Sequence, residues 1–537
     1  MMINRKKNNN TSFLNSLRFF PAPGSKEQMV AGCKKHWAFL LFLTAMAIYY
    51  GIRMFKLDPW YDELYTYYSF ISKGPIYSAI HWPVPNNHVM YSVVSAFLNI
   101  FGNPYLSLRG ISFLSSLSNL TLLYLLCNKF SGRLLSLSCV AFYSGLYLVN
   151  SLSIQGRGYT MAITFYLLSL LMLFEICVNK KNHWLYYALF SLSLTWGLYT
   201  ITSNLYWVLP TCFVGGFYLL VLKDFKRLGK LVISSIIAAV HTFCLYTLIW
   251  LAIGSNLLSK TADSGFYGLW QVTIILKAPF KAFLTGMNYM LASPYVQSMD
   301  RNVVISEFIP WVTGLFNQYI VNSGRLILLF LLLLLCITIF LIISEVQGTL
   351  EVPLFFHIYS VVTLGMIPLI LIVQSVQPYH RVFTFLGVTL SITLFSAIPH
   401  TRAMVRGIKW ELPLCILFLT FCCFNLCSPY YRAPYADRES KVKEVLWQSG
   451  KAEHIENICF MDDYQKYVLQ FFYDIRPTEA AFDEAQYILL PREITDKNYT
   501  AKTWPILYTY DEINWSHLSN YEVITETKDY IFYYKNK

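Results

Sequence analysis

Long apolar runs recur along this sequence and limit what it can fold into. A helix that crosses a bilayer needs about 20 mostly apolar residues. About eleven runs meet that need: residues 37–54, 110–127, 134–153, 159–178, 184–199, 204–222, 231–253, 325–344, 353–376, 382–398 and 411–428. The chain is 55% hydrophobic and 13% charged, whereas a soluble domain is about 25% charged. The sequence therefore predicts a polytopic α-helical membrane protein.

One further apolar stretch, residues 88–101, is too short to cross a bilayer comfortably. Its apolar residues recur at helical spacing, with serine and asparagine between them, which predicts an amphipathic helix lying in the membrane interface. The alternative is a short, tilted span. The positions of lysine and arginine bear on this choice, because cytoplasmic loops are enriched in these residues.

The positive-inside rule favours the interfacial helix. With the N-terminus in the cytoplasm and 88–101 not crossing, four basic loops fall on the cytoplasmic side. They are residues 128–133, 179–183, 223–230 and 399–409. If 88–101 crossed, all four loops would lie outside, against the rule. The same topology places residues 55–109, 254–324 and the tail from about 429 outside the cytoplasm.

The composition changes sharply near residue 429. Residues 429–537 hold 18 acidic and 13 basic residues, a net charge of −5, while the whole chain carries +12. Helix-like runs (440–448, 464–473) alternate there with strand-like runs (458–461, 487–490, 521–525 and 531–534). We therefore expect a transmembrane domain over residues 1–428 and a small extracytoplasmic α/β domain over 429–537. Positive-inside loops explain the basic excess of the membrane part, so no nucleic-acid partner is expected.

Polar residues gather in the segments predicted to lie outside. These are Trp60, Asp62, Glu63, Asn86, Asn87, His88 and Arg109 in the first segment, and Arg157, Tyr159, His380 and Arg381 in later turns. A carboxylate can take a proton from a hydroxyl, and arginine can hold a phosphate through two hydrogen bonds. An acidic pair opposite several cations suits chemistry that combines a base with a phosphate. The membrane location suggests that the phosphate belongs to a lipid.

Structural explanations stand beside these assignments. Asp62 and Glu63 could lie in a solvated loop or cap a helix. Arg109 could snorkel at a helix end, the asparagines could cap a helix, and His380 could be an ordinary interfacial histidine. No histidine or cysteine pattern has the spacing of metal ligands, so no cofactor is assigned, although a divalent metal at Asp62 and Glu63 is an open alternative.

The order and spacing of these motifs resemble a known superfamily. Trp-x-Asp-Glu in the first outer loop, an amphipathic helix after a His/Pro segment, the stretch FGNPYLSLRG and an RGY turn are similar to the GT-C glycosyltransferases. More closely, the chain looks like the protein O-mannosyltransferase and aminoarabinose (lipid A) transferase family. The resemblance covers roughly residues 37–400 and is strongest over 55–175.

The resemblance implies an inverting hexosyl- or pentosyltransferase of the cell envelope. It would move a sugar from a polyprenyl phosphate, such as undecaprenyl phosphate, to a hydroxyl acceptor outside the cytoplasm. By family position Asp62 would be the base, and Glu63 would orient the acceptor or assist. Arg109, Arg157, His380 and Arg381 would bind the lipid or its phosphate. Trp60, Asn86, Asn87, His88 and Tyr159 would contact the acceptor or the sugar.

Two positions depart from the family pattern. The late Arg-Tyr pair reads HRVF here, so no tyrosine follows Arg381, and the usual His-Pro-Pro run is replaced by PVPNNH. Two other functions stay open. A lipid-linked-sugar flippase or transporter would need cations to bind phosphate, but it would not need a carboxylate pair at one end of its cavity. An O-antigen-ligase-like transferase needs no Trp-x-Asp-Glu loop.

The resemblance also suggests a location. The chain lacks the large inserted sugar-binding-like domain of eukaryotic protein mannosyltransferases, so the bacterial inner membrane is expected. The acceptor could be a lipid, a surface glycan or a protein hydroxyl, and the sequence favours none of these.

Overall fold

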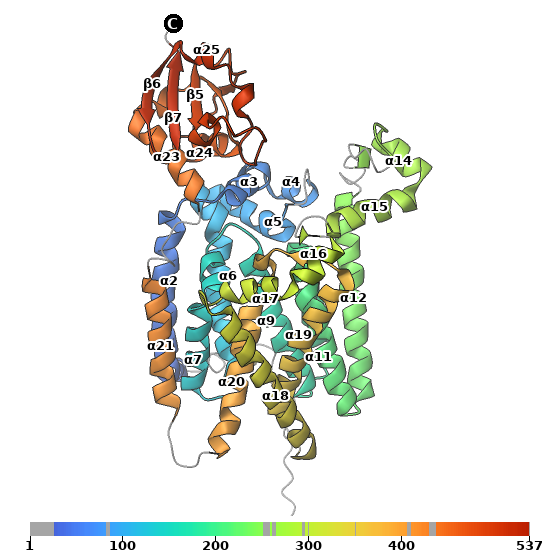
Figure 1. Cartoon of the computed structure of the whole chain (residues 1–537). Helices are drawn as coiled ribbons and strands as arrows, with labels where there is room; N and C mark the ends of the chain where they lie inside the picture. Colours follow the sequence, from blue (N-terminus) through green and yellow to red (C-terminus); the bar gives the residue numbers. More distant parts are fainter. Residues whose placement is uncertain are drawn as a thin grey trace, which may run out of the picture.

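Most of the chain forms one bundle of helices with a small sheet at one end (Figure 1). The computed structural model describes residues 26–81, 86–250, 258–259, 265–292, 296–298, 300–348, 351–404, 410–428 and 436–535. The basic N-terminal segment and the residues just after the predicted domain boundary lie outside these ranges. The two-domain division at 428/429 stays a prediction.

Each of the eleven predicted runs contains helix where it is described, although 134–153 and 382–398 are interrupted by turns. The long helices are α2 (Lys26–Lys56), α6 (Pro104–Cys127), α9 (Tyr159–Cys177), α10 (Trp184–Thr200), α11 (Leu205–Val221), α12 (Phe225–Ile249), α18 (Gly324–Gly348), α19 (Glu351–Gln374), α20 (Leu386–Met404) and α21 (Glu411–Cys427). Seven stretches in the described part of the chain are long and apolar enough to cross a membrane. The prediction of a polytopic helical membrane protein is therefore confirmed.

The run predicted over 134–153 is two helices, not one continuous span. These are α7 (Arg133–Ser144) and α8 (Tyr147–Leu152). The break at Gly145 is held by α21, because Asn425 Nδ2 donates to the Gly145 carbonyl at 2.9 Å. A Cβ at Gly145 would lie 2.7 Å from the Phe421 ring, so the close approach of α21 requires glycine there.

Helix α9 lies at the centre of the bundle, and 89% of its apolar window is buried. At the periphery only 22% of the corresponding window of α12 and 11% of that of α18 are buried. Their exposed faces are apolar, which suits contact with lipid, since a helix satisfies its own backbone hydrogen bonds inside a membrane.

The two ends of α9 define two ends of the bundle. At its start, the Tyr159 ring packs against His88, with ring centroids 5.0 Å apart, close to α3 (Tyr61–Ser69). At its finish, the Cys177 carbonyl accepts a hydrogen bond from Arg227 at 3.0 Å. Nineteen residues at 1.5 Å each separate these ends by about 28 Å. We call the first the site end and the second, which carries loops 128–133, 179–183 and 223–230, the basic end.

The predicted interfacial helix is present as a short helix at the site end. It comprises α5 (Val89–Leu98), extended by the 3₁₀ turn η2 (Asn99–Phe101), and it follows η1 (Ile71–Lys73) and α4 (Pro75–Ile80). Its serines, including Ser92 and Ser95, face the protein and are buried, whereas Phe97, Ile100 and Phe101 are exposed. Val89, Tyr91 and Ala96 are buried with the serines, so only the C-terminal end of this helix presents apolar side chains outward.

Smaller elements of the middle loops complete the site end. They are η3 (Thr202–Asn204), α14 (Gln271–Lys277), α15 (Pro279–Ala292), β1 (Val296–Ser298), α16 (Arg301–Ser306), α17 (Phe308–Asn317), β2 (Gln377–Pro378) and η6 (His380–Phe383). Strand β1 pairs antiparallel with β2. This pairing places the segment before His380 beside the long middle loop.

The C-terminal residues form the α/β unit that the sequence predicts. Its elements are α23 (Asp437–Ser449), η7 (Ala452–His454), β3 (Asn457–Cys459), α24 (Asp463–Tyr473), β4 (Thr478–Glu479), β5 (Tyr487–Pro491), η8 (Arg492–Thr495), η9 (Tyr510–Glu512), α25 (Trp515–Leu518), β6 (Tyr521–Glu526) and β7 (Tyr530–Lys535). The strand order is β4-β3-β5-β7-β6, parallel from β4 to β5 and antiparallel beyond.

Both faces of this sheet are covered. Strand β5 is buried along its whole length, with Leu489 in one apolar cluster together with α23 and α24 and Ile488 in another. Successive strand residues point to opposite faces, so the near-continuous apolar run of β5 fits a central strand. The predicted α/β class is confirmed.

Candidate functional site

The two acidic residues lie in the first turn of α3, at the site end. Negative side chains are favourable there, because the helix N-terminus carries partial positive charge. Glu63 Oε2 also accepts the Trp60 backbone N–H at 3.0 Å, which is half of a capping box. Adjacent helical residues point about 100° apart, so Asp62 and Glu63 face different surroundings.

Glu63 faces inward and forms a buried ion pair with Arg109 of α6. Arg109 Nε and Nη2 each lie 2.8 Å from one Glu63 oxygen, and neither side chain is exposed to solvent. Glu63 Oε1 also accepts the Gly156 backbone N–H. Gly156 is required here, since a Cβ would lie 2.5 Å from the Leu108 side chain. This contact ties three segments of the site end together.

The sequence pattern assigned Arg109 to a donor phosphate, but its guanidinium is occupied by protein atoms in this structure. Its remaining N–H groups donate to the carbonyls of Met54 at 3.0 Å, Leu57 at 2.6 Å and Asp58 at 3.2 Å. All five guanidinium donors are thus engaged. Arg109 holds the loop between α2 and α3 and has no donor left for a lipid phosphate.

Asp62 faces the other way and pairs with Arg381. Arg381 Nη1 lies 2.9 Å from Asp62 Oδ2, and the side chains are 24% and 17% exposed, respectively. The guanidinium also lies over the rings of Trp60, at 5.2 Å, and Tyr379, at 5.1 Å. Burial alone would lower the pKa of Arg381, but Tyr159, Asp62 and Tyr379 raise it above its ordinary value. The cation beside Asp62 therefore stays charged.

Arg157 lies behind Asp62 and is almost fully buried. It donates to Thr66 Oγ1 at 2.7 Å, to the Asn86 carbonyl at 3.2 Å and to Asn86 Oδ1. Its Nη2 lies 3.2 Å from His88 Nε2. Of Asp62 it reaches only the backbone carbonyl, at 3.4 Å. Thus the structure brings Arg157, Asn86 and His88 together beneath the Asp62 turn, as neighbours of the acid and not as its ion-pair partners.

His88 is neutral in this environment. Burial, and next the charges of Arg157 and Arg381, hold the pKa of His88 well below its usual value. His88 Nδ1 accepts the Gly158 backbone N–H at 2.8 Å. A Cβ at Gly158 would lie 2.6 Å from Thr200 and 3.1 Å from His88, so this glycine allows the two segments to meet.

Three buried polar atoms around His88 have no hydrogen-bond partner in the protein. They are Nε of Arg157, Nε of Arg381 and the hydroxyl of Tyr159. All three are donors, and two carry positive charge. Unsatisfied buried donors are uncommon, so this group is suited to an anionic ligand.

Two other predicted residues have structural contacts. Asn87 is buried and donates to the carbonyls of Ser78 at 2.8 Å and His81 at 3.1 Å, and it accepts from Ser92. It braces α4 against α5, and the residue that precedes α5 as its N-cap is His88. His380 contacts the Trp311 carbonyl at 3.1 Å. Burial lowers the pKa of His380, so it is a weak candidate for a second cation.

The sequence alone did not reveal that the C-terminal unit packs on α3. Tyr61 contacts Tyr464, Tyr467 and Trp504 at ring-centroid distances of 4.9, 5.6 and 5.4 Å. Aromatic residues of α3 thus hold this unit in place. The aromatic content of both segments was a signal, but it named no partner.

Polar contacts reinforce the same interface. Lys443 Nζ and Ser440 Oγ of α23 lie 2.7 and 2.9 Å from the Asp58 carboxylate. The Tyr61 backbone N–H donates to Glu439. Burial, opposed by backbone hydrogen bonds, raises the pKa of Glu439 to about 8. The α23 helix is thus fixed directly against the turn that carries Asp62.

A metal shared by Asp62 and Glu63 would require Glu63 to give up its present contacts. Both Glu63 oxygens already accept hydrogen bonds from Arg109, and each accepts a backbone N–H as well. Within the described ranges, no group of three or more histidine, cysteine or acidic residues is placed to hold a metal ion.

No protein-family model matches the sequence, and no curated protein matches it. Among solved structures, the chain is similar to ArnT from Cupriavidus metallidurans bound to undecaprenyl phosphate. The TM-score is 0.54 at 10% identity, over 92% of this chain and 98% of that chain. For ArnT in the apo state the TM-score is 0.52 at 8% identity, over 92% of this chain and 97% of that chain. For the oligosaccharyltransferase AglB from Archaeoglobus fulgidus the TM-score is 0.44 at 10% identity, over 87% of this chain and 71% of that chain. The likeness to ArnT extends over almost the whole of both chains and shows that this chain shares the fold of ArnT, as the motifs led us to expect.

Proposed function

We propose that this chain, which has the GT-C fold, is an inverting glycosyltransferase. It would move a sugar from a polyprenyl-phosphate donor to a hydroxyl acceptor. The observation that carries the proposal is one partly exposed carboxylate, Asp62, paired with Arg381 beside the unsatisfied donors of Arg157, Arg381 and Tyr159. ArnT, which shares the fold, has been solved with undecaprenyl phosphate, and this supports the same class of donor here.

The site has the groups that this transfer requires. Asp62 takes the proton of the acceptor hydroxyl, and the hydroxyl oxygen attacks the anomeric carbon from the face opposite the phosphate. The bond from that carbon to the phosphate oxygen breaks, and its electron pair leaves with the polyprenyl phosphate. Attack and departure on opposite faces invert the anomeric centre. Arg381 and Arg157 stabilise the departing charge.

The ion pair between Asp62 and Arg381 suggests how donor binding prepares the base. Without donor, Arg381 neutralises Asp62. The donor phosphate competes for the same guanidinium, and arginine binds phosphate through two hydrogen bonds. As Arg381 turns to the phosphate, the Asp62 carboxylate becomes free to accept a proton.

In this proposal Glu63 and Arg109 are positioning residues. Their buried pair fixes the first turn of α3, and with it the direction of Asp62. The sequence pattern assigned Glu63 an assisting role at the acceptor, but its oxygens are occupied by Arg109 and two backbone N–H groups. Asp62 alone is left to act as the base.

The positions of the charges support an extracytoplasmic site. Asp62 and Arg381 lie at the site end, about 28 Å from the basic end along the 19 residues of α9. Basic loops mark the cytoplasmic side of membrane proteins. The N-terminus would then be cytoplasmic and the C-terminal unit extracytoplasmic, in the inner membrane of a bacterium.

The test is transfer by Asp62→Asn protein. A positioned base contributes about 10²–10⁴-fold to rate, so release of polyprenyl phosphate from a polyprenyl-phosphate sugar should fall by at least about 100-fold. Mass spectrometry of glycolipids and glycoproteins from a deletion strain would name the product. Asp58→Asn is the matched control, because Asp58 is a nearby carboxylate that contacts Lys443 and not the site; it should keep most of the activity.

Two results would reject the proposal. Normal turnover by the Asp62→Asn variant would show that Asp62 is not the base. Movement of an intact lipid-linked sugar across the membrane, without cleavage of its phosphate bond, would indicate a flippase instead.

A further inference from the structure

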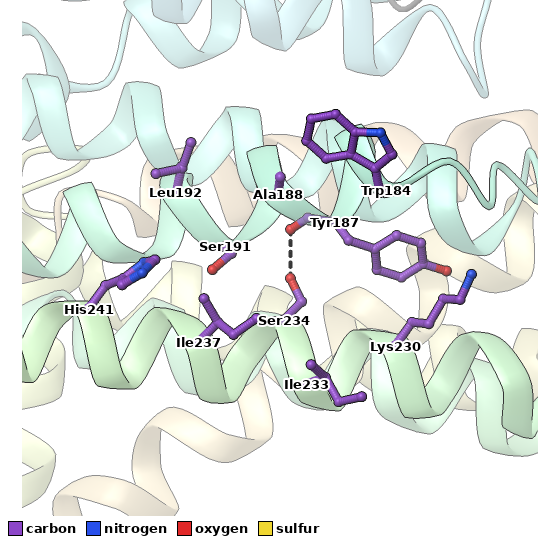
Figure 2. Close-up of a pocket in the computed structure, with 10 residues that line it drawn as sticks. All are labelled: Trp184, Tyr187, Ala188, Ser191, Leu192, Lys230, Ile233, Ser234, Ile237 and His241. Atoms are coloured by element: carbon purple, nitrogen blue, oxygen red, sulfur yellow. Dashed lines mark hydrogen bonds between the residues drawn. The ribbon is translucent and has the colours of Figure 1, made fainter.

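A groove lies between α10 and α12, away from the site described above. It encloses a cavity of ≈ 470 Å³ with almost wholly apolar walls. Figure 2 shows its residues on the two facing helices. Only 22% of the apolar window of α12 is buried, so the outer side of this helix, and the mouth of the groove, face the lipid of a membrane.

The length of the groove corresponds to one leaflet. It extends along α12 from Lys230 to His241, and eleven residues of helix span about 16 Å. The hydrocarbon core of a bilayer is about 30 Å thick, so half of it is about 15 Å. Lys230 lies three residues from Arg227, which contacts the last turn of α9. The groove therefore begins at the basic end and occupies the leaflet on that side.

Polar groups collect at one end of the groove. Lys230 Nζ donates to Asn182 Oδ1 at 2.9 Å and lies 5.8 Å above the Tyr187 ring. Trp184, 69% exposed, lies at the same end, as tryptophan does at membrane interfaces.

Two buried hydroxyls in this groove have no partner in the protein. They belong to Tyr187 and, one turn further along α10, to Ser191. Both side chains are less than 10% exposed. A buried hydroxyl without a hydrogen bond is costly, so their position along the groove indicates a ligand with acceptor oxygens at two depths.

We propose that this groove binds one anionic glycerophospholipid from the leaflet at the basic end. The phosphate accepts hydrogen bonds from Lys230 and Tyr187, and an ester carbonyl accepts one from Ser191. An acyl chain then lies along Ile233, Ile237 and Leu192. The volume suits part of such a lipid, since small-molecule sites measure about 300–1,000 Å³.

Charge around the groove favours an anionic headgroup. The loops at this end contribute Lys180, Lys181 and Lys223. A basic residue in contact with an anionic headgroup raises affinity about fivefold. A polyprenyl-phosphate donor would be expected at the other end of the bundle, and a second protein helix would leave the two hydroxyls without acceptors.

The test is native mass spectrometry of the full chain in detergent, after delipidation and addition of phosphatidylglycerol or phosphatidylcholine. Wild type should retain one phosphatidylglycerol per chain and at least fivefold less phosphatidylcholine. Lys230→Gln with Tyr187→Phe should lower phosphatidylglycerol retention at least fivefold. Ala188→Phe, which fills the groove and leaves its charge unchanged, should do the same while the protein stays monodisperse.

Lys226→Gln is the matched control. Lys226 lies on the same helix, four residues before Lys230, but is exposed and outside the groove; its loss should leave retention unchanged. Equal loss in this variant would mean a diffuse surface attraction and would overturn the proposal. No retained lipid in wild type, equal retention of phosphatidylcholine, or a retained mass equal to polyprenyl phosphate would each overturn it as well.

Discussion

Asp62 and Glu63 are neighbours in the chain, yet they occupy opposite environments. Glu63 is fully buried and paired with Arg109 through two hydrogen bonds, whereas Asp62 keeps partial exposure and one contact with Arg381. A carboxylate with every oxygen occupied stabilises a fold. A carboxylate with one contact, which a ligand can displace, is available for proton transfer. Within a single helical turn, Glu63 therefore stabilises the fold and Asp62 is available for the reaction.

The largest effect should be on stability, from Glu63→Gln. Removing one partner of a buried ion pair leaves an uncompensated charge, which costs about 3–5 kcal/mol of unfolding free energy. Asp62→Asn should cost less, because the pair of Asp62 with Arg381 is partly exposed. Thermal unfolding of both variants in detergent measures the difference. Equal destabilisation would break the contrast between the two acids.

A double variant sharpens the same result. Glu63→Gln with Arg109→Gln removes both charges, so it should be more stable than Glu63→Gln alone. The coupling between residues in one such network is about 0.5–3 kcal/mol. Strict additivity would show that the pair is not the source of the effect.

The next effect is on activity, from Arg381→Gln. Loss of a cation that stabilises a leaving phosphate is expected to lower the transfer rate by about 100-fold, as for other preorganised electrostatic donors. Its ion pair with Asp62 is only partly exposed, so the variant should also lose some stability, but less than Glu63→Gln. Arg381→Lys should recover only part of the rate, because lysine cannot bind in the same planar, two-point manner.

The contact between α23 and α3 should weaken as pH rises. Burial raises the folded-state pKa of Glu439 to about 8, from an ordinary value of 4.5. The folded state therefore binds the extra proton, and this contribution is complete below about pH 4.5 and lost as pH rises through about 8. The slope is up to about 1.4 kcal/mol per pH unit. Melting temperatures from pH 5 to 8 should fall more for wild type than for Glu439→Gln.

A smaller change is expected from Lys443→Gln. Lys443 is 40% exposed where it pairs with Asp58, and such pairs contribute at most about 1 kcal/mol. The loss should be smaller still at high salt, where exposed charges are screened. A loss as large as that of Glu63→Gln would mean that the docked C-terminal unit depends on this single contact.

Chelation should have the least effect. Since the Glu63 oxygens are already occupied, EDTA treatment is expected to leave the transfer rate unchanged. A loss of activity that Mg²⁺ or Mn²⁺ restores would instead support a metal bound at Asp62 and Glu63, and would require Glu63 to leave Arg109.

Composition and charge were enough to predict the helical bundle, the short helix at 88–101 and the α/β tail. These features follow from lengths of apolar runs and from the rule that loops of one side are basic. The partners of Glu63 and Asp62 were not predictable in the same way. Arg109 and Arg381 lie 46 and 319 positions from the acids they contact. Only the folded arrangement shows which of the two arginines has all of its hydrogen bonds to protein atoms.

The packing of the C-terminal unit against Tyr61 has an evolutionary consequence. Tyr61 directly precedes Asp62, and its ring is held by Tyr464, Tyr467 and Trp504. A recombination event that exchanged the tail at residue 428 would separate these rings from α3. Helix α3 and the tail are therefore expected to evolve together. Substitutions at Tyr61 should be accompanied by changes on α24 in descendants of this sequence.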